Sequence, residues 1–226
     1  MNEPRTVNPS RPSGPGVRWF PPSVSVANPS RPSGPGTSQT WRTTDLMVVV
    51  VVALVFGAIY VAWAGPYAWV AAFGGTPTQE AANGLWFVAG LLGPYLIRRP
   101  GAAVASEVLA SLAEMLVGAP WGPGLVIYGL LQSIGAEAVF ALFGYRRWTL
   151  VTMVIAGVAA GLVSLPYSWW DYGYFELDVP VLATMLVTRT VGVAVAGIIA
   201  KYLGDALVLT GALKDTAIGR ASVEEV

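Results

Sequence analysis

The sequence contains no cysteine and no histidine. The lack of cysteine excludes disulfides and thiolate metal sites, and the lack of histidine excludes imidazole metal sites, Ser-His catalytic pairs and HExxH helices. Charged residues make up only 12% of the 226 residues, about half of the roughly 25% in soluble domains. The formal net charge is zero, so bulk charge gives no support for a nucleic-acid partner.

Apolar residues dominate instead, at 54% of the chain with a mean hydropathy of +0.59. Most of the apolar runs approach the ~20 residues that a helix needs to cross a bilayer. We therefore predict an all-α polytopic membrane protein whose membrane domain spans residues 43–212. The six predicted transmembrane helices cover 46–64, 81–97, 101–118, 124–144, 149–169 and 180–200.

The first 42 residues are different in composition. Nine of the seventeen prolines lie there, and the segment "NPSRPSGPG" occurs at 8–16 and again at 28–36. Such a composition cannot bury enough apolar surface to fold, so we predict a disordered cytoplasmic tail. It has no apolar h-region, which argues against a cleaved signal peptide. Residues 213–226 are predicted to be a second cytoplasmic tail.

The basic residues alternate between the connections. Three connections, near 65–80, 119–123 and 170–179, contain no Lys or Arg. By the positive-inside rule, this pattern predicts six spans of a cell membrane with both termini in the cytoplasm. The basic residues that flank the spans are Arg42, Arg98, Arg99, Arg146, Arg147, Lys201, Lys214 and Arg220.

Ionisable residues within a span are costly and mark candidate functional sites. Four occur here, namely Glu107, Glu114, Glu137 and Arg189, and Gln132 is a further polar residue. Glu107 and Glu114 are seven residues apart, nearly two helical turns, so they share a face about 10 Å apart along the axis. That face must point into the bundle or into a wet cavity.

Depth along the helices predicts two polar layers. The outer layer contains Glu114, Tyr128, Gln132 and the connecting Trp121. A carboxylate, an amide and aromatic faces suit a small, flat, nitrogen-rich ligand that can be cationic. The alternative is polar contact between helices together with an interfacial aromatic belt.

The inner layer is predicted to contain Glu107 and Glu137, neutralised by Arg189 or by protonation. A structural ion pair or an interhelical hydrogen bond is the alternative interpretation.

Small residues at i, i+4 spacing indicate close helix packing or a docking face for another membrane subunit. In the first span they are Ala53 with Gly57, and Ala58 with Ala62. The chain has no phosphate-binding loop of the Walker type, so any ATP hydrolysis must come from another chain.

Residues 105–148, "ASEVLASLAEMLVGAPWGPGLVIYGLLQSIGAEAVFALFGYRRW", resemble the YkoE family. These proteins are substrate-binding S components of energy-coupling-factor (ECF) transporters. The resemblance is carried by the two glutamates seven apart, "PWG", "LLQSIGAE", the closing "YRRW" and the "WRTTDL" before the first span. It extends over about residues 41–210.

The resemblance implies a transporter subunit rather than an enzyme, with no cofactor and no metal. Its substrate would be thiamine or the hydroxymethylpyrimidine precursor (HMP), and its partners a transmembrane T component and ATPase subunits. The first span would then dock the T component. The expected substrate-binding residues are Glu114, Gln132, Trp121, Tyr128, Glu107, Trp86 and Trp170.

Three alternatives stay open at this stage. The first is another small heteroaromatic solute. The second is a proton-coupled secondary carrier that uses Glu107 and Glu137 as a relay. The third is an intramembrane enzyme, which the lack of histidine and cysteine disfavours.

Overall fold

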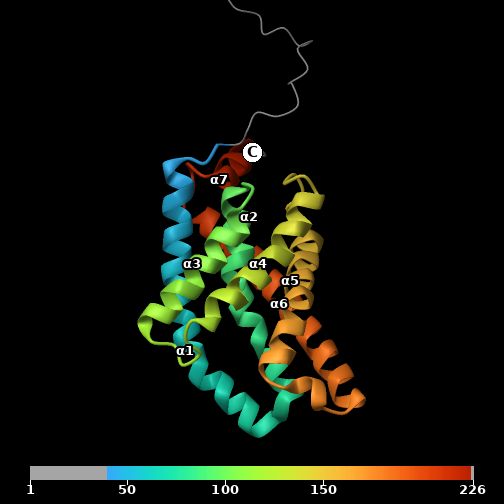
Figure 1. Ribbon diagram of the computed structural model, residues 1–226. Helices are drawn as coiled ribbons and strands as arrows, with labels where there is room; N and C mark the ends of the chain where they lie inside the picture. The colour runs from blue at the N-terminus through green and yellow to red at the C-terminus, as the bar shows by residue number, and fades with distance from the viewer. Residues whose placement is uncertain (1–39, 225–226) are drawn as a thin grey trace, which may run out of the picture. The chain divides into compact units, whose positions relative to one another are not determined.

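The computed structural model describes residues 40–224, with side chains described to residue 221. Within this range all regular structure is helical, which confirms the all-α expectation (Figure 1). The elements are α1 (Thr43–Ala82), η1 (Asn83–Phe87), α2 (Val88–Ile97), α3 (Ala102–Val117), α4 (Gly124–Leu142), α5 (Leu150–Asp171), η2 (Tyr174–Glu176), α6 (Val179–Leu209) and α7 (Ala217–Glu224). The predicted tail at residues 1–42 lies almost wholly outside the described residues.

Helix α1 continues beyond the first predicted span. It contains Pro66 and Pro77, and the helix breaks at Gly75, whose φ of 70° and ψ of 179° are far from helical. Only glycine adopts this backbone conformation at little cost. The expected connection at 65–80 is therefore largely helical, with a sharp turn at Gly75.

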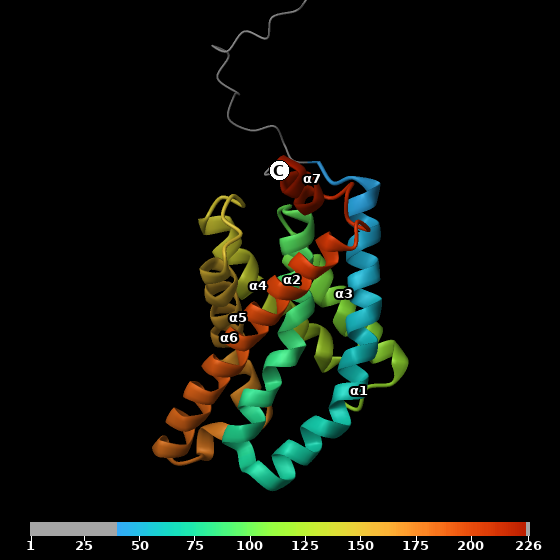
Figure 2. The same ribbon diagram turned by 180° about the vertical axis from the view of Figure 1, so that it is seen from behind.

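Helix α2 forms the centre of the bundle. All ten of its residues are buried, and it packs against α1, α3 and α6. A helix that is apolar on every side is stable only where neighbours cover it completely. Figure 2 shows α6 crossing in front of α2, while α4 and α5 pack together beside them.

Among residues 40–224, four helical segments are long and apolar enough to cross a membrane, namely Thr43–Ile97, Gly124–Leu142, Leu150–Asp171 and Val179–Leu209. The first combines α1, η1 and α2, so it covers two of the predicted spans. Helix α3 has 16 residues, fewer than the ~20 that a crossing helix usually needs. The chain is thus a multi-pass membrane protein, and the count of six crossings stays a prediction.

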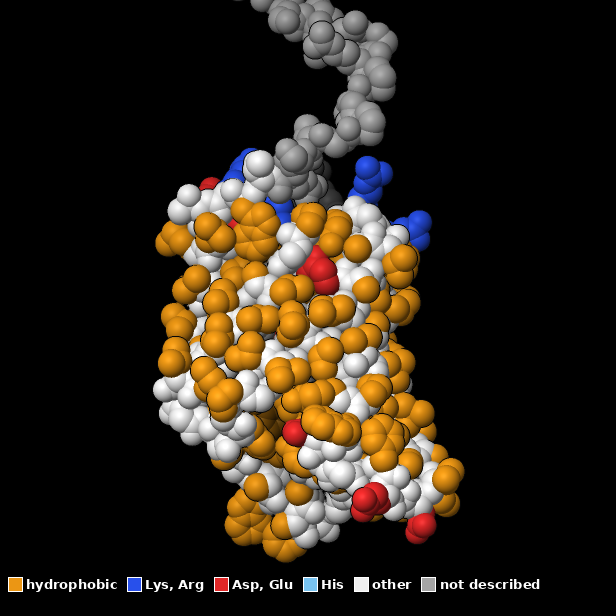
Figure 3. All heavy atoms as spheres, in the orientation of Figure 1, with side chains coloured by type: hydrophobic (Ala, Val, Ile, Leu, Met, Phe, Trp, Pro, Cys, Tyr) orange, Lys and Arg blue, Asp and Glu red, His pale blue; other side chains and the backbone are white. Residues whose placement is uncertain are grey.

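The sides of the bundle carry exposed apolar side chains, as a lipid-facing surface requires. Figure 3 shows hydrophobic side chains over most of this face, with Lys and Arg at the end that carries α7. Leu54, Leu142 and Leu209 are 60%, 84% and 87% exposed. The C-terminal segment that was expected to be a tail contains α7, which packs on α2 and α6 with Ile218 buried.

Candidate functional site

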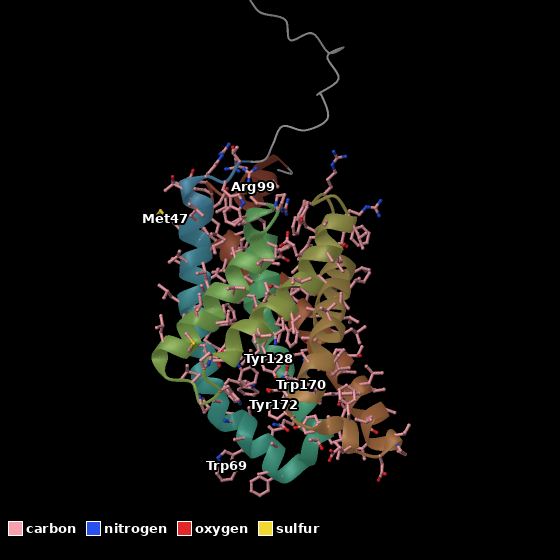
Figure 4. All side chains as sticks on the ribbon, viewed as in Figure 1. Met47, Trp69, Arg99, Tyr128, Trp170 and Tyr172 are labelled. Atoms are coloured by element: carbon pink, nitrogen blue, oxygen red, sulfur yellow. The ribbon has the colours of Figure 1, made fainter. Side chains whose placement is uncertain are left out.

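A cavity opens among α1, η1, α4 and α5, at the end of the bundle away from α7. Figure 4 shows Tyr128 and Tyr172 on this part of the bundle. The lining residues are Tyr67, Asn83, Trp86, Trp121, Leu125, Tyr128, Gln132, Ser168 and Tyr172. Three of the expected ligand contacts in the outer layer, Trp121, Tyr128 and Gln132, are among them.

Three aromatic side chains form one wall of the cavity. The Trp86 ring meets Tyr67 at 4.8 Å between centroids and Trp121 at 5.5 Å, both edge to face. Tyr67 and Trp121 are 6.4 Å apart. Such packing holds the rings in fixed orientations, so they offer a preformed surface on which a flat ring or a cation can stack.

Glu114 lies behind this wall. Its Oε1 accepts a hydrogen bond from the Trp86 indole N–H at 3.0 Å, and only 1% of the residue is exposed. Its Oε2 is buried and has no hydrogen-bond partner among the described residues. Glu114 does not itself line the cavity. A ligand group that reached it past Trp86 would find an unused carboxylate oxygen.

Asn83 places a second unused acceptor in the cavity lining. Its Nδ2 donates to the Tyr67 hydroxyl at 3.3 Å, while Oδ1 is buried and lacks a partner among the described residues. The Gln132 side chain of α4 also belongs to the lining. Because an amide carries both a donor and an acceptor, two amide side chains in the cavity lining can form hydrogen bonds with donors and with acceptors of a ligand ring.

The rim of the cavity is polar and aromatic. Tyr128 donates to Asp171 Oδ2 at 2.7 Å, which ties α4 to the end of α5. Trp170 does not belong to the lining: it is 67% exposed and packs on Tyr167. The structure therefore does not place Trp170 in this lining, and its contact with the ligand stays a prediction.

Glu107 has a different role from Glu114. Its Oε2 accepts from the Gly90 N–H at 2.6 Å and from the Tyr60 hydroxyl at 3.4 Å. The Tyr60 hydroxyl in turn accepts from the Ala89 N–H at 3.0 Å. These N–H groups belong to the first turn of α2, where helical partners are missing and negative charge is favoured. Glu107 thus caps α2 from the neighbouring helix α3, away from the cavity.

Glu137 does the same for α3. Its two oxygens accept from the N–H groups of Gly101 and Ala103, at 2.6 and 2.9 Å, and Oε1 also accepts from the Tyr145 hydroxyl at 2.7 Å. Partial burial, together with the hydrogen bond to Glu137, raises the pKa of the Tyr145 phenol well above its usual value. The phenol therefore stays a hydrogen-bond donor at physiological pH.

Arg189 pairs with a residue that was assigned to an outer connection. Its Nη1 donates to Glu80 Oε2 at 2.6 Å and its Nη2 to Ser164 Oγ at 3.0 Å. The predicted partners, Glu107 and Glu137, are engaged elsewhere, so the expected inner layer is corrected. Arg189 instead joins α6 to the last turns of α1, immediately before Asn83.

The small residues of α1 divide between two faces. Ala53 and Gly57 are buried, and a Cβ added to Gly57 would lie 2.6 Å from Ala113 Cβ on α3. They pack within the bundle, which corrects their assignment to a docking face. Ala58 and Ala62 are exposed. Only this second pair is free to meet another membrane subunit.

Two functional candidates were not predicted. Asn83 was included in the apolar run 81–97, and Glu80 lay in the expected connection near 65–80. Asn83 pairs with Tyr67, and Glu80 pairs with Arg189 of α6. Both partners are distant in the sequence, so no spacing pattern within one helix could predict these contacts. The polarity of Asn83 next to Trp86 at the start of a span is the one signal that could have marked it.

Residues 44–163 match the family described as "ABC-type cobalt transport system, permease component". A curated relative, YkoE of Bacillus subtilis (strain 168), is named an HMP/thiamine permease protein. It is 32% identical over 80% of this chain and 92% of its own length. The chain belongs to the YkoE family. A solved structure, titled as an S component of an ECF transporter, matches with a TM-score of 0.80 at 32% identity, over 82% of this chain and 95% of the other.

Membership in the YkoE family gives the general role of the protein. The protein is a substrate-binding subunit of a transporter and not an enzyme, and it resides in the cell membrane as a multi-pass protein. The cavity described above is the candidate place where this YkoE-family protein holds its solute.

Proposed function

We propose that the protein captures thiamine or HMP in the cavity lined by Trp86, Trp121, Asn83 and Gln132. The observation that carries the proposal is a pair of buried acceptors, Glu114 Oε2 and Asn83 Oδ1, that have no partner within residues 40–224 and lie beside a preformed aromatic wall. Both candidate substrates contain an aminopyrimidine, which presents an amino group next to ring nitrogens. The name of the Bacillus relative supports the same solute class.

The two acceptors take different parts in this proposal. Asn83 and Gln132 line the cavity and form hydrogen bonds directly with the edge of the pyrimidine ring. Glu114 orients the Trp86 indole through its N–H and offers its second oxygen to the ligand amino group. A buried acceptor without a partner costs about 1–3 kcal/mol. Binding of a donor relieves this cost, so the site favours ligands that carry an amino group over analogues that lack it.

Uptake then requires chains other than this one. We propose that six helices cross the membrane with both termini in the cytoplasm, so that the cavity faces outside. A separate T component and ATPase subunits would drive release to the inside. The exposed residues Ala58 and Ala62 of α1 are the proposed contact with the T component. The gathering of basic side chains at the end that carries α7 supports this orientation.

Cobalt, which appears in the description of the matched family, is a poor fit to these residues. Co²⁺ is bound in proteins chiefly by imidazole, thiolate and clustered carboxylates. The sequence has neither histidine nor cysteine, and the described residues contain no cluster of three acidic side chains that could hold a metal ion. An organic ring suits the aromatic wall better.

The test is a titration of tryptophan fluorescence with thiamine and with HMP, for the wild type, Glu114→Gln and Glu176→Gln. Glu176 is exposed beyond α5 and serves as the control. We expect saturable quenching in the wild type, a loss of at least about tenfold, or ~1.4 kcal/mol, for Glu114→Gln, and no change for the control. Quenching that survives Glu114→Gln would move the recognition to Asn83 and Gln132. A folded wild type that binds neither compound would overturn the proposal.

A further inference from the structure

Asp171 stands at the edge of the solute cavity without lining it. It is the last residue of α5, and two residues from the same helix end, Ser168 and Tyr172, belong to the lining. Its Oδ2 accepts a hydrogen bond at 2.7 Å from the hydroxyl of Tyr128, a third lining residue on α4. The carboxylate of Asp171 is therefore held within one side chain of the cavity.

The charge of Asp171 is not neutralised by a neighbouring cation. Its hydrogen-bond partner Tyr128 is a phenol, and no Lys or Arg among residues 40–221 forms an ion pair with it. The three predicted outer connections contain no Lys or Arg either. Figure 3 shows acidic side chains and no basic ones at the end of this face that lies away from α7. Negative charge therefore prevails at the end of the bundle that contains the cavity.

Two features near the cavity could attract an anion, and both are already engaged. The first turn of a helix offers unpaired N–H groups, but those of Leu125 and Val126 in α4 donate to carbonyls three residues earlier, each at 3.2 Å. The Arg189 guanidinium does not line the cavity and pairs with Glu80 at 2.6 Å. Among the described residues, none that lines the cavity is basic. A phosphate group in this lining would thus meet no positive counter-charge.

A cation is favoured at the same edge. The last turn of α5 borders the cavity through Ser168 and Tyr172, and a helix carries partial negative charge at its C-terminal end. Tyr128 and Tyr172 both line this part of the bundle (Figure 4), and aromatic rings attract cations. Asp171 adds a full negative charge to these partial charges. A positively charged ring is therefore stabilised at the Asp171 edge.

We propose that Asp171 is a specificity-determining residue that selects a cationic solute over uncharged and phosphorylated forms of the same ring system. This inference rests on the proposed function, in which Asn83 and Gln132 hold an aminopyrimidine. Thiamine then directs its permanently cationic thiazolium ring toward Asp171. HMP has no permanent charge. A phosphate ester places an anion next to the carboxylate, where like charges repel each other.

The test is calorimetric titration of the purified full-length protein with thiamine, HMP and thiamine monophosphate. Asp171→Asn removes the charge and keeps an oxygen acceptor for Tyr128. Asp215→Asn is the matched control, because Asp215 is exposed in the turn between α6 and α7, at the other end of the bundle.

We expect the wild type to bind thiamine monophosphate at least about tenfold more weakly than thiamine. In Asp171→Asn the affinity for thiamine should fall about threefold, as for an exposed charge pair, while HMP is unaffected and thiamine monophosphate binds more tightly. Added salt should weaken thiamine binding to the wild type without affecting HMP, because salt screens exposed charges. Asp215→Asn should leave all three affinities unchanged.

The selectivity between solutes distinguishes this role of Asp171 from a structural one. Equal losses for thiamine and HMP in Asp171→Asn would overturn the inference, and so would a wild type that binds thiamine monophosphate as tightly as thiamine. In both cases the vitamin still binds, so the proposed function stands. A folded wild type that binds neither thiamine nor HMP would overturn the proposed function and this inference with it. If Asp171→Asn does not fold, the salt dependence of the wild type decides the outcome.

Discussion

Arg189 and Glu80 form an ion pair of 2.6 Å with side chains only 1% and 5% exposed. The pair joins the middle of α6 to the segment that follows the break at Gly75. Three residues further along the chain, Asn83 enters the cavity lining. The Arg189 guanidinium also lies 5.4 Å from the centre of the Phe87 ring, so it contacts residues both before η1 and at its end.

We predict that Arg189→Met destabilises the protein by about 3–5 kcal/mol, because it leaves the Glu80 carboxylate buried and uncompensated. The double variant Arg189→Met with Glu80→Leu should recover most of this loss, since it removes both charges. Thermal unfolding in detergent measures the stabilities. A double variant as unstable as Arg189→Met alone would show that the pair contributes more than mutual neutralisation.

The role of the Trp86 N–H can be separated from that of its ring. Trp86→Phe keeps an aromatic face against Tyr67 and Trp121 but removes the donor to Glu114. We expect the affinity for thiamine to fall at least about tenfold, because the carboxylate loses its orienting partner. Trp69→Phe is the control, since Trp69 is 68% exposed and outside the lining. Calorimetric titration gives both affinities, and equal effects of the two changes would contradict the proposed role.

Glu107→Leu should damage stability more than binding. It removes the acceptor for the Gly90 N–H and the Tyr60 hydroxyl, and the loss of buried partners costs about 1–3 kcal/mol. Glu107→Gln keeps one acceptor oxygen, so a smaller loss is expected. The measurements are thermal unfolding and thiamine affinity in the folded fraction. A large loss of affinity in a stable Glu107→Gln protein would return Glu107 to the binding site.

The sequence predicts which polar side chains are buried within the bundle better than it predicts the role of each side chain. The seven-residue spacing places Glu107 and Glu114 on one face, and both are indeed buried on α3. Their roles differ because Glu107 faces the start of α2, whereas Glu114 faces the Trp86 indole. Which backbone N–H or ring stands opposite a side chain depends on the register between helices, and no pattern within one helix contains that information.

Hydropathy has a similar limit. The run 81–97 was predicted as one membrane span, but the structure divides it into η1 and α2, with every residue of α2 buried in protein. Lipid and a protein core select the same apolar residues, so composition cannot distinguish the two surroundings. Likewise, residues 65–80 were expected to be a connection but are largely helical and contain Pro66 and Pro77. Helices within a membrane bundle tolerate proline when neighbours satisfy the backbone.

The two faces of α1 provide a matched test of T-component docking. Ala58→Leu lies on the exposed face, so we expect stability and thiamine affinity close to those of the wild type, with assembly and uptake strongly reduced. Gly57→Leu should instead destabilise the isolated subunit by about 1–3 kcal/mol, because its Cβ would lie 2.6 Å from Ala113 Cβ. Co-purification with the T component and vitamin uptake by cells measure assembly and transport. Normal assembly of the Ala58→Leu protein would place the docking surface on another helix.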